Sequence, residues 1–97
     1  MSKYIIAYDL HKPDTTDENY DLLDKTIVAQ ASSSLHAKKI LNTTFIIQSQ
    51  SGPQSISLAI GTVVSQHKLK CDFFVSEYRQ NTDYYYKDGH VVSRTSY

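Results

Sequence analysis

Two side chains with acid–base chemistry stand close together where the first apolar run of the chain ends. Asp9 follows the run Tyr4-Ile-Ile-Ala-Tyr, and His11 comes two residues later. A carboxylate at the end of a strand can bind a hard metal ion, and an imidazole can act as a general base. Simpler roles also fit, because Asp9 can bond the backbone of residues 10–12 in a turn and His11 can be an exposed loop histidine. We take Asp9 and His11 as candidate catalytic residues and Asp14 as a weaker second carboxylate.

Lysines provide a second candidate site. Lys38 and Lys39 form a basic pair that phosphate groups can contact, and Lys68 and Lys70 would join it if their strands lay side by side. The alternative is a solvated strand edge, where lysine discourages pairing with other chains. The histidines lack the spacing of zinc ligands, and no P-loop or nucleophile elbow is present. Cys71 lies in an apolar run and is expected to be a small core residue.

The composition is that of one folded domain without a charge bias. The chain has 97 residues, of which 40% are hydrophobic and 21% charged, enough for a single modest core. Ten basic residues balance ten acidic ones, and only two are arginine, which argues against a dedicated nucleic-acid binder. The sequence shows no signal peptide and no apolar run of about 20 residues. We therefore expect a cytoplasmic protein without a membrane partner.

The elements that must position these side chains alternate between strands and helices. In chain order we expect a strand over 3–9, a helix from about Thr15 to about Ser33, strands over 36–41 and 43–48, a helix opening at Pro53 with Ile56, Ala59, Ile60, Val63 and His67 on one face, and a strand over 71–78. Thr15 and Glu18 have the spacing of a capping box, and Pro53 suits a first helical turn. This order predicts a ferredoxin-like α+β sandwich, βαββαβ, with both helices on one face of an antiparallel sheet and the first and third strands in its middle.

The last part of the chain, residues 79–97, is expected to be a separate tail containing a hairpin. Asp88-Gly89 lies between two β-rich runs and predicts a type I′ turn. A hairpin alone is marginal in water, so it must pack against its own sheet or another chain. Tyrosine is favoured at interfaces, and the alternatives are base stacking or a partly ordered tail over the sheet. The expected interface residues are Tyr84, Tyr85, Tyr86, Val91 and Val92.

Three segments of residues 1–78 resemble the small ferredoxin-like proteins of the CRISPR adaptation machinery, the Cas-two superfamily, with its SinR-like and VapD-type relatives. The segments are Tyr4-Ile-Ile-Ala-Tyr-Asp9-Leu10 with Lys12-Pro13 after it, Asn42-Thr-Thr-Phe-Ile-Ile-Gln-Ser49, and Cys71-Asp-Phe-Phe-Val-Ser-Glu77. The resemblance is nearest to the SinR-like branch. It implies a twofold dimer, often with exchanged C-terminal strands, in which Asp9 approaches its symmetry mate and holds Mg²⁺ for phosphodiester cleavage. Two departures from the pattern are the neutral charge and lysines, at 38 and 39, where relatives often offer arginine.

Two functions follow as hypotheses. The first is a homodimeric, metal-dependent endonuclease or endoribonuclease that acts on RNA or DNA phosphodiesters through Asp9 and His11. Two facing carboxylates would repel each other, and a divalent cation between them relieves that repulsion. The second is a non-catalytic dimeric module that binds another protein, in the setting of host–mobile-element conflict. The neutral charge and the tyrosine-rich hairpin favour this alternative.

Overall fold

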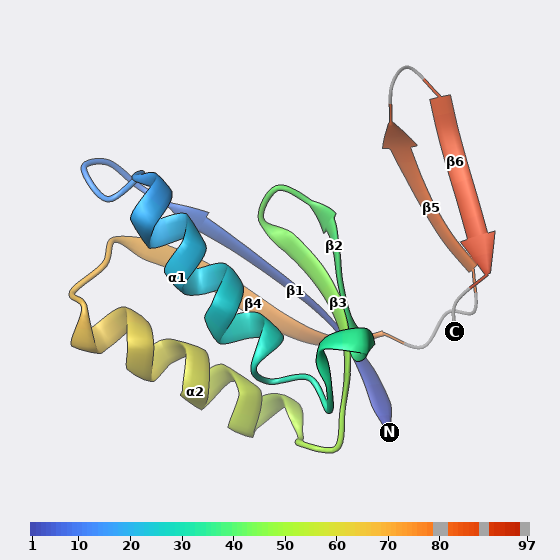
Figure 1. Ribbon diagram of the computed structural model, residues 1–97, viewed down its shortest axis with the longest axis horizontal. Helices are drawn as coiled ribbons and strands as arrows, with labels where there is room; N and C mark the ends of the chain where they lie inside the picture. The colour runs from blue at the N-terminus through green and yellow to red at the C-terminus, as the bar shows by residue number, and fades with distance from the viewer. Residues whose placement is uncertain (79–81, 88–89, 96–97) are drawn as a thin grey trace.

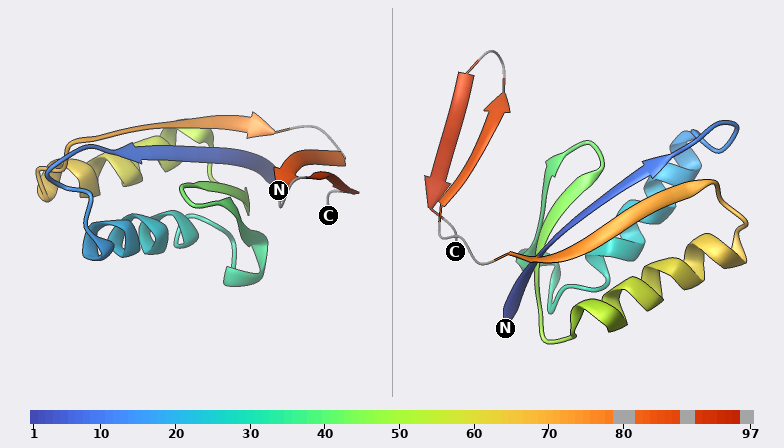
Figure 2. Two further views of the ribbon diagram at one scale, coloured as in Figure 1. Left: turned by 90° about the horizontal axis from the view of Figure 1, so that it is seen from above. Right: turned by 180° about the vertical axis from the view of Figure 1, so that it is seen from behind.

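The chain folds into a four-stranded antiparallel sheet with two helices on one face and a separate two-stranded hairpin (Figures 1 and 2). The computed structural model describes residues 1–78, 82–87 and 90–95. The elements are β1 (Ser2–Leu10), α1 (Asp17–Val28), the 3₁₀ turn η1 (Ser34–His36), β2 (Ala37–Leu41), β3 (Thr44–Ser49), α2 (Pro53–Gln66), β4 (Cys71–Tyr78), β5 (Thr82–Lys87) and β6 (His90–Thr95). The strand order β2-β3-β1-β4 puts the first and third strands in the middle. The predicted ferredoxin-like α+β fold is confirmed.

Strand β1 has one face toward the helices and one away from them. Tyr4, Ile6, Tyr8 and Leu10 are each at most 4% exposed, whereas Asp9 is exposed. This alternation follows from the two-residue repeat of a strand. The β1 residues pair directly with β3 on one side and with β4 on the other, and paired residues share a face of the sheet. The helices therefore cover one face, and the other face carries Asp9.

Helix α1 ends earlier than the sequence predicts, and its N-cap lies one residue later. Its N-cap is Thr16, whose side-chain oxygen accepts a hydrogen bond from the Asn19 backbone N–H, so the predicted capping role of Thr15 is wrong. The helix ends at Val28 rather than near Ser33. Beyond it, the Ser32 backbone N–H donates to the Gln48 carbonyl of β3 at 2.9 Å. A contact distant in sequence thus replaces the helical bonds that local pattern alone predicts.

Helix α2 begins at Pro53, as predicted, and packs Ile56 and Ile60 into the core with no side-chain exposure. His67 was expected on this face, but it is the C-cap residue and is exposed. Val64 packs against the core instead. Burying a side chain such as Ile60 completely is worth about 1.5–3 kcal/mol. The core residues buried together are Tyr4, Ile6, Tyr8, Leu10, Leu23, Ile27, Phe45, Ile47, Ile56 and Ile60.

The predicted hairpin is present as an antiparallel pair of strands, β5 and β6. Tyr84, Tyr85 and Tyr86 lie on β5, and Val91 and Val92 lie opposite on β6. The two residues of the predicted turn, Asp88 and Gly89, lie outside the described residues, as do 79–81 and 96–97. Use of this hairpin as an interface stays a prediction. Among residues 1–78, 82–87 and 90–95, no helix is both long and apolar enough to cross a membrane.

Candidate acid–base site at the ends of β1 and β4

The end of β1 meets the start of β4 with a carboxylate on each strand. Asp9 and Asp72 are direct partners in the antiparallel pairing, so both side chains stand on the face that the helices leave uncovered. The Asp9 and Asp72 side chains are 78% and 87% exposed. Two carboxylates directly opposite each other on a sheet are destabilising unless a cation or a hydrogen-bond donor lies between them.

His11 supplies that donor. Its Nε2 lies 2.9 Å from Oδ2 of Asp72, and its Nδ1 lies 3.9 Å from Oδ2 of Asp9. The first distance is a hydrogen bond and the second is not. The imidazole therefore bonds Asp72 and presents its other nitrogen toward Asp9. The sequence placed Asp9 and His11 together, and the structure adds Asp72 to them.

The loop that carries His11 is fastened to the residue before β4. The His11 backbone N–H donates to the Lys70 carbonyl at 2.8 Å, and the Lys70 N–H donates to Oδ2 of Asp14 at 2.7 Å. Asp14 thus has a structural role and does not join the carboxylates of the site. These bonds hold His11 beside Asp72 although the two residues are 61 positions apart.

The two carboxylates favour the charged form of the imidazole. The hydrogen bond to Asp72 and the negative charges of Asp9 and Asp72 raise the pKa of His11 above its ordinary value of 6.5. The hydrogen bond to Asp72 is the largest of these effects, and desolvation, the next largest, opposes them. The His11 side chain is 47% exposed, so solvent can exchange protons with it. An imidazole of this kind can hold and release a proton near neutral pH.

The turn role considered for Asp9 is not observed. The Asp9 carboxylate accepts no hydrogen bond from the backbone of residues 10–12 within the described part of the chain. The ion-pair contact of its side chain is with Nδ1 of His11, at 3.9 Å. The Asp9 oxygens are therefore open to water, a cation or a donor from another molecule.

A network on the opposite face of the sheet anchors the end of β1. The Tyr8 hydroxyl donates to Oδ1 of Asp24 at 2.7 Å, and Nζ of Lys39 lies 2.7 Å from Oδ2 of Asp24. Burial, and next the hydrogen bond to Asp24, raise the pKa of Tyr8, so the hydroxyl stays protonated and donates. The Asp24 carboxylate on α1 thus links β2 to Tyr8 of β1, the residue that precedes Asp9.

Cys71 behaves as the sequence predicts. It pairs with Leu10 across the strands and packs against the core. Burial raises the pKa of the Cys71 thiol, so the thiol stays protonated at neutral pH and is a poor nucleophile. It lies next to the site in sequence but on the other face of the sheet.

Lys38 and Lys39 do not lie beside Lys68 and Lys70, so the condition for a common basic cluster is not met. Lys38 and Lys39 are on β2, at one edge of the sheet, whereas Lys68 and Lys70 precede β4 at the other edge. Lys38 and Lys39 themselves pair with consecutive residues of β3 and so point to opposite faces. Lys39 is bonded to Asp24 on the helix side and lies 5.8 Å from the centre of the Phe45 ring. Only Lys38 of this pair stands on the same face as Asp9.

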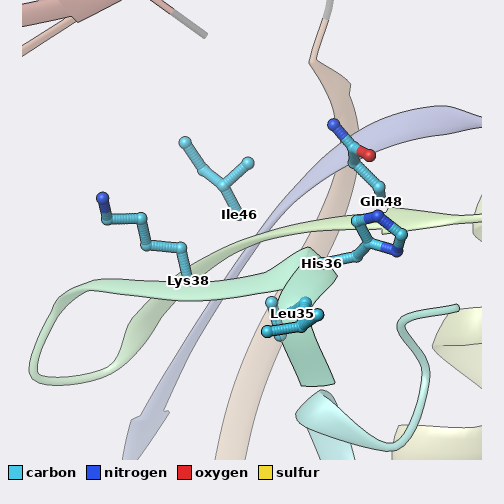
Figure 3. Close-up of a pocket in the computed structure, with 6 residues that line it drawn as sticks. Leu35, His36, Lys38, Ile46 and Gln48 are labelled. Carbon is cyan, nitrogen blue, oxygen red and sulfur yellow. The ribbon is translucent and has the colours of Figure 1, made fainter. Parts of the chain in front are cut away.

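Two hollows mark the uncovered face. One, of about 250 Å³, lies beside the carboxylates and is lined by Ala7, Tyr8, Asp9, Asp72, Phe73 and Phe74. The other, of about 300 Å³, lies at the β2 edge and is lined by Leu35, His36, Ala37, Lys38, Ile46 and Gln48 (Figure 3). The second hollow has a buried apolar floor in Ile46, which is 2% exposed. The acid–base chemistry is at the first hollow, and the second offers an apolar contact surface.

Asp72 is the residue of the site that the sequence did not single out. It lies within the apolar run of β4, where a single charged residue reads as part of a strand face. A signal was present, because a ferredoxin-like topology pairs the first and last strands of the four-stranded sheet antiparallel. The start of the last strand must then lie beside the end of the first. Placing Asp72 opposite Asp9 requires the register of that pairing as well.

The residues at this site fit Mg²⁺ only as a partial set of ligands. Within the described residues, no group of three or more His, Cys, Asp or Glu side chains could hold a metal ion. Mg²⁺ needs only one or two carboxylates, with water and phosphate oxygens completing its shell. The Asp9 carboxylate, 78% exposed, meets that lower requirement.

Comparisons with protein-family models, with curated proteins and with solved structures found no match for this chain. The resemblance to the Cas-two superfamily therefore stays a prediction.

Proposed function

We propose that the protein is a homodimeric endonuclease of the Cas-two type that hydrolyses phosphodiester bonds, with RNA as the first substrate to test. The observation that carries this proposal is the imidazole of His11, held by Asp72 with its free nitrogen toward Asp9. Phosphodiester hydrolysis needs a base for the attacking water and a group that offsets charge at phosphorus. His11 suits the first need, and a cation on Asp9 suits the second.

The proton chemistry assigns one role to His11. In its neutral form, Nδ1 accepts a proton from the attacking water as the new P–O bond forms. The bond from phosphorus to the leaving oxygen breaks, and that oxygen takes up a proton from solvent or from the imidazolium. The net reaction consumes one water and yields a phosphate monoester and a hydroxyl. The imidazolium formed midway is stabilised by Asp72.

Asp9 is the proposed ligand for Mg²⁺, shared with the Asp9 of a second copy. When bound, the ion supplies Lewis-acid polarisation of a phosphoryl oxygen. Asp9 is open to such an arrangement because its side chain is 78% exposed on the uncovered face. Phe74, which is 54% exposed, lines the hollow beside it. We infer that this face forms the dimer contact.

A cleavage assay tests the proposal. Purified protein is incubated with end-labelled single-stranded RNA, and in parallel with DNA, with Mg²⁺ or with excess EDTA. We expect Mg²⁺-dependent cleavage, and a fall in kcat of about 100-fold or more in Asp9→Asn, because metal polarisation is worth several kcal/mol and each 1.36 kcal/mol is tenfold.

Asp21→Asn is the matched control. Asp21 is also an exposed aspartate, paired with Lys25 one helical turn away on α1, and its loss should leave cleavage unchanged. Cleavage that persists in Asp9→Asn, or that falls equally in both variants, contradicts the proposal.

A protein-binding module is the second candidate, and the hollow at the β2 edge favours it. Leu35, which lines this hollow, is 92% exposed, and Leu41 at the end of β2 is 54% exposed. Exposed apolar side chains at the two ends of an edge strand can contribute to a protein contact. If this function holds, a truncation after residue 79 should abolish dimerisation or partner binding, and any nucleic-acid binding should be too weak to show a steep salt dependence. A truncated chain that dimerises normally would argue against it.

A further inference from the structure

We propose that Asp72 is a positioning residue that fixes the tautomer and the orientation of His11, leaving the Nδ1 lone pair turned toward Asp9. This inference rests on the proposed function, since it assigns the reacting atom of the same site. It also makes a claim about the imidazole that holds without any substrate. Asp72 belongs neither to the candidate residues of the sequence nor to those that the family resemblance implies.

The distances to the two carboxylates distinguish the two imidazole nitrogens of His11. Nε2 is 2.9 Å from Oδ2 of Asp72, and a carboxylate in its ionised form only accepts hydrogen bonds. The proton of neutral His11 must therefore be on Nε2, which leaves the Nδ1 lone pair free. Nδ1 is 3.9 Å from Oδ2 of Asp9. One water molecule at ordinary hydrogen-bond distances can donate one hydrogen bond to Nδ1 and the other to Oδ2 of Asp9.

The groups around the imidazole come from both packed strands. Asp9 on β1 and Asp72 on β4 are the charged groups that act on His11. Only Asp72 is within hydrogen-bond distance. Asp72 therefore sets the orientation of the ring, whereas Asp9 acts on it through charge alone and stays free for a cation or water. This division of roles follows from geometry and gives two carboxylates two different functions.

The backbone makes the arrangement rigid. Asp72 is held in the β1–β4 ladder opposite Asp9, and His11 is held by its N–H bond to the Lys70 carbonyl. The backbone positions of both residues are therefore fixed. A carboxylate that orients a histidine and stabilises its imidazolium is the arrangement that general-base catalysis uses in hydrolases.

The experiment follows the imidazole of His11 by NMR, with its signals assigned by loss in His11→Gln. In the wild-type protein, nitrogen shifts above the His11 pKa should show the proton on Nε2. In Asp72→Asn the Nε2 proton loses its anionic acceptor, so the nitrogen shifts should show a larger share of the tautomer with the proton on Nδ1. Asp72→Glu should restore part of the wild-type tautomer ratio, and Asp21→Asn should change nothing. A wild-type proton on Nδ1, or an unchanged tautomer ratio in Asp72→Asn, overturns the inference.

Kinetics on the same variants give the second readout. We expect kcat of Asp72→Asn to fall by about 10- to 100-fold, less than the 10²–10⁴ that a positioned acid–base group contributes, because His11 itself is kept. KM should stay unchanged, and Asp72→Glu should recover part of the lost kcat because it keeps a carboxylate beside Nε2. A fall in kcat that is equal in Asp72→Asn and Asp72→Glu would overturn the positioning role. Absent wild-type cleavage combined with the expected NMR result would refute the proposed function and leave the role of Asp72 intact.

Discussion

Neighbouring residues of β1 serve opposite faces of the sheet at its C-terminal end. The Tyr8 hydroxyl donates to Asp24 beneath the sheet, and Asp9 lies above it beside His11. Asp24 also pairs with Lys39 of β2. The position of Asp9 therefore depends on a polar network on the helix side of the sheet, opposite the face that carries Asp9. Hydrogen bonds to charged groups of this kind are stronger than neutral ones.

Tyr8→Phe should lower the free energy of unfolding by about 1–2 kcal/mol, since a hydrogen bond to a charged group is lost at a site with little access to water. Tyr8 is only 4% exposed, whereas Asp24 keeps its pair with Lys39. Urea unfolding measures the change. Tyr20→Phe is the control, because it removes the hydroxyl of the neighbouring ring, 6.2 Å away between centroids, and keeps the Asp24 bond. Equal stability of Tyr8→Phe and the wild type would show that this bond contributes nothing net.

At the residue scale, sequence reasoning found the chemistry but not its geometry. Asp9 and His11 stand close together in sequence, so their spacing alone indicated a site. The sequence spacing did not show whether Asp72 and Asp14 belong to the site. Asp72 joins the site through strand register, and Asp14 leaves it because the Lys70 N–H captures its carboxylate. Both outcomes depend on contacts more than fifty positions apart.

At the element scale, the ends of α1 show where local pattern fails. Thr15 and Thr16 are both good N-cap residues, and Thr15 has the capping-box partner Glu18. The structure uses Thr16, and the carbonyl of Asp14 accepts both the Thr16 N–H and the Asn19 side chain. The loop fastened to Lys70 therefore sets where the helix begins. The order and type of the helices and strands were predictable, whereas the 3₁₀ turn η1 and this boundary were not.

The two adjacent threonines give a direct test of that boundary. Thr16→Ala should lower the free energy of unfolding by about 1 kcal/mol, because it removes the N-cap acceptor of the Asn19 N–H. Thr15→Ala, one residue earlier, should change it by less than about 0.5 kcal/mol. Thermal or urea unfolding of both variants measures the difference. A larger loss in Thr15→Ala would mean that the helix starts one residue earlier in solution.

At the scale of the whole molecule, the sheet has one face covered by helices and one that carries the site. Register predicts which residues share the uncovered face, since Phe74 pairs with Ala7 and Asp72 with Asp9. The fold class follows from the order of strands and helices, and the sequence predicted it. Periodicity within one chain predicts which face the helices cover, and it does not indicate whether another chain covers the second face.

The proposed dimer requires contact through this uncovered face, because only there can the Asp9 side chains of two copies approach each other. Phe74→Asp should therefore convert the dimer to a monomer, since it places a charge at a 54% exposed apolar residue beside the site. Leu58→Asp is the matched control, because Leu58 is 71% exposed on α2, on the other side of the molecule. Sedimentation equilibrium measures the mass of each variant. A Phe74→Asp protein that stays dimeric would mean that the copies meet elsewhere, and the shared-cation role of Asp9 would fall with it, whereas the hydrogen bond between His11 and Asp72 would remain.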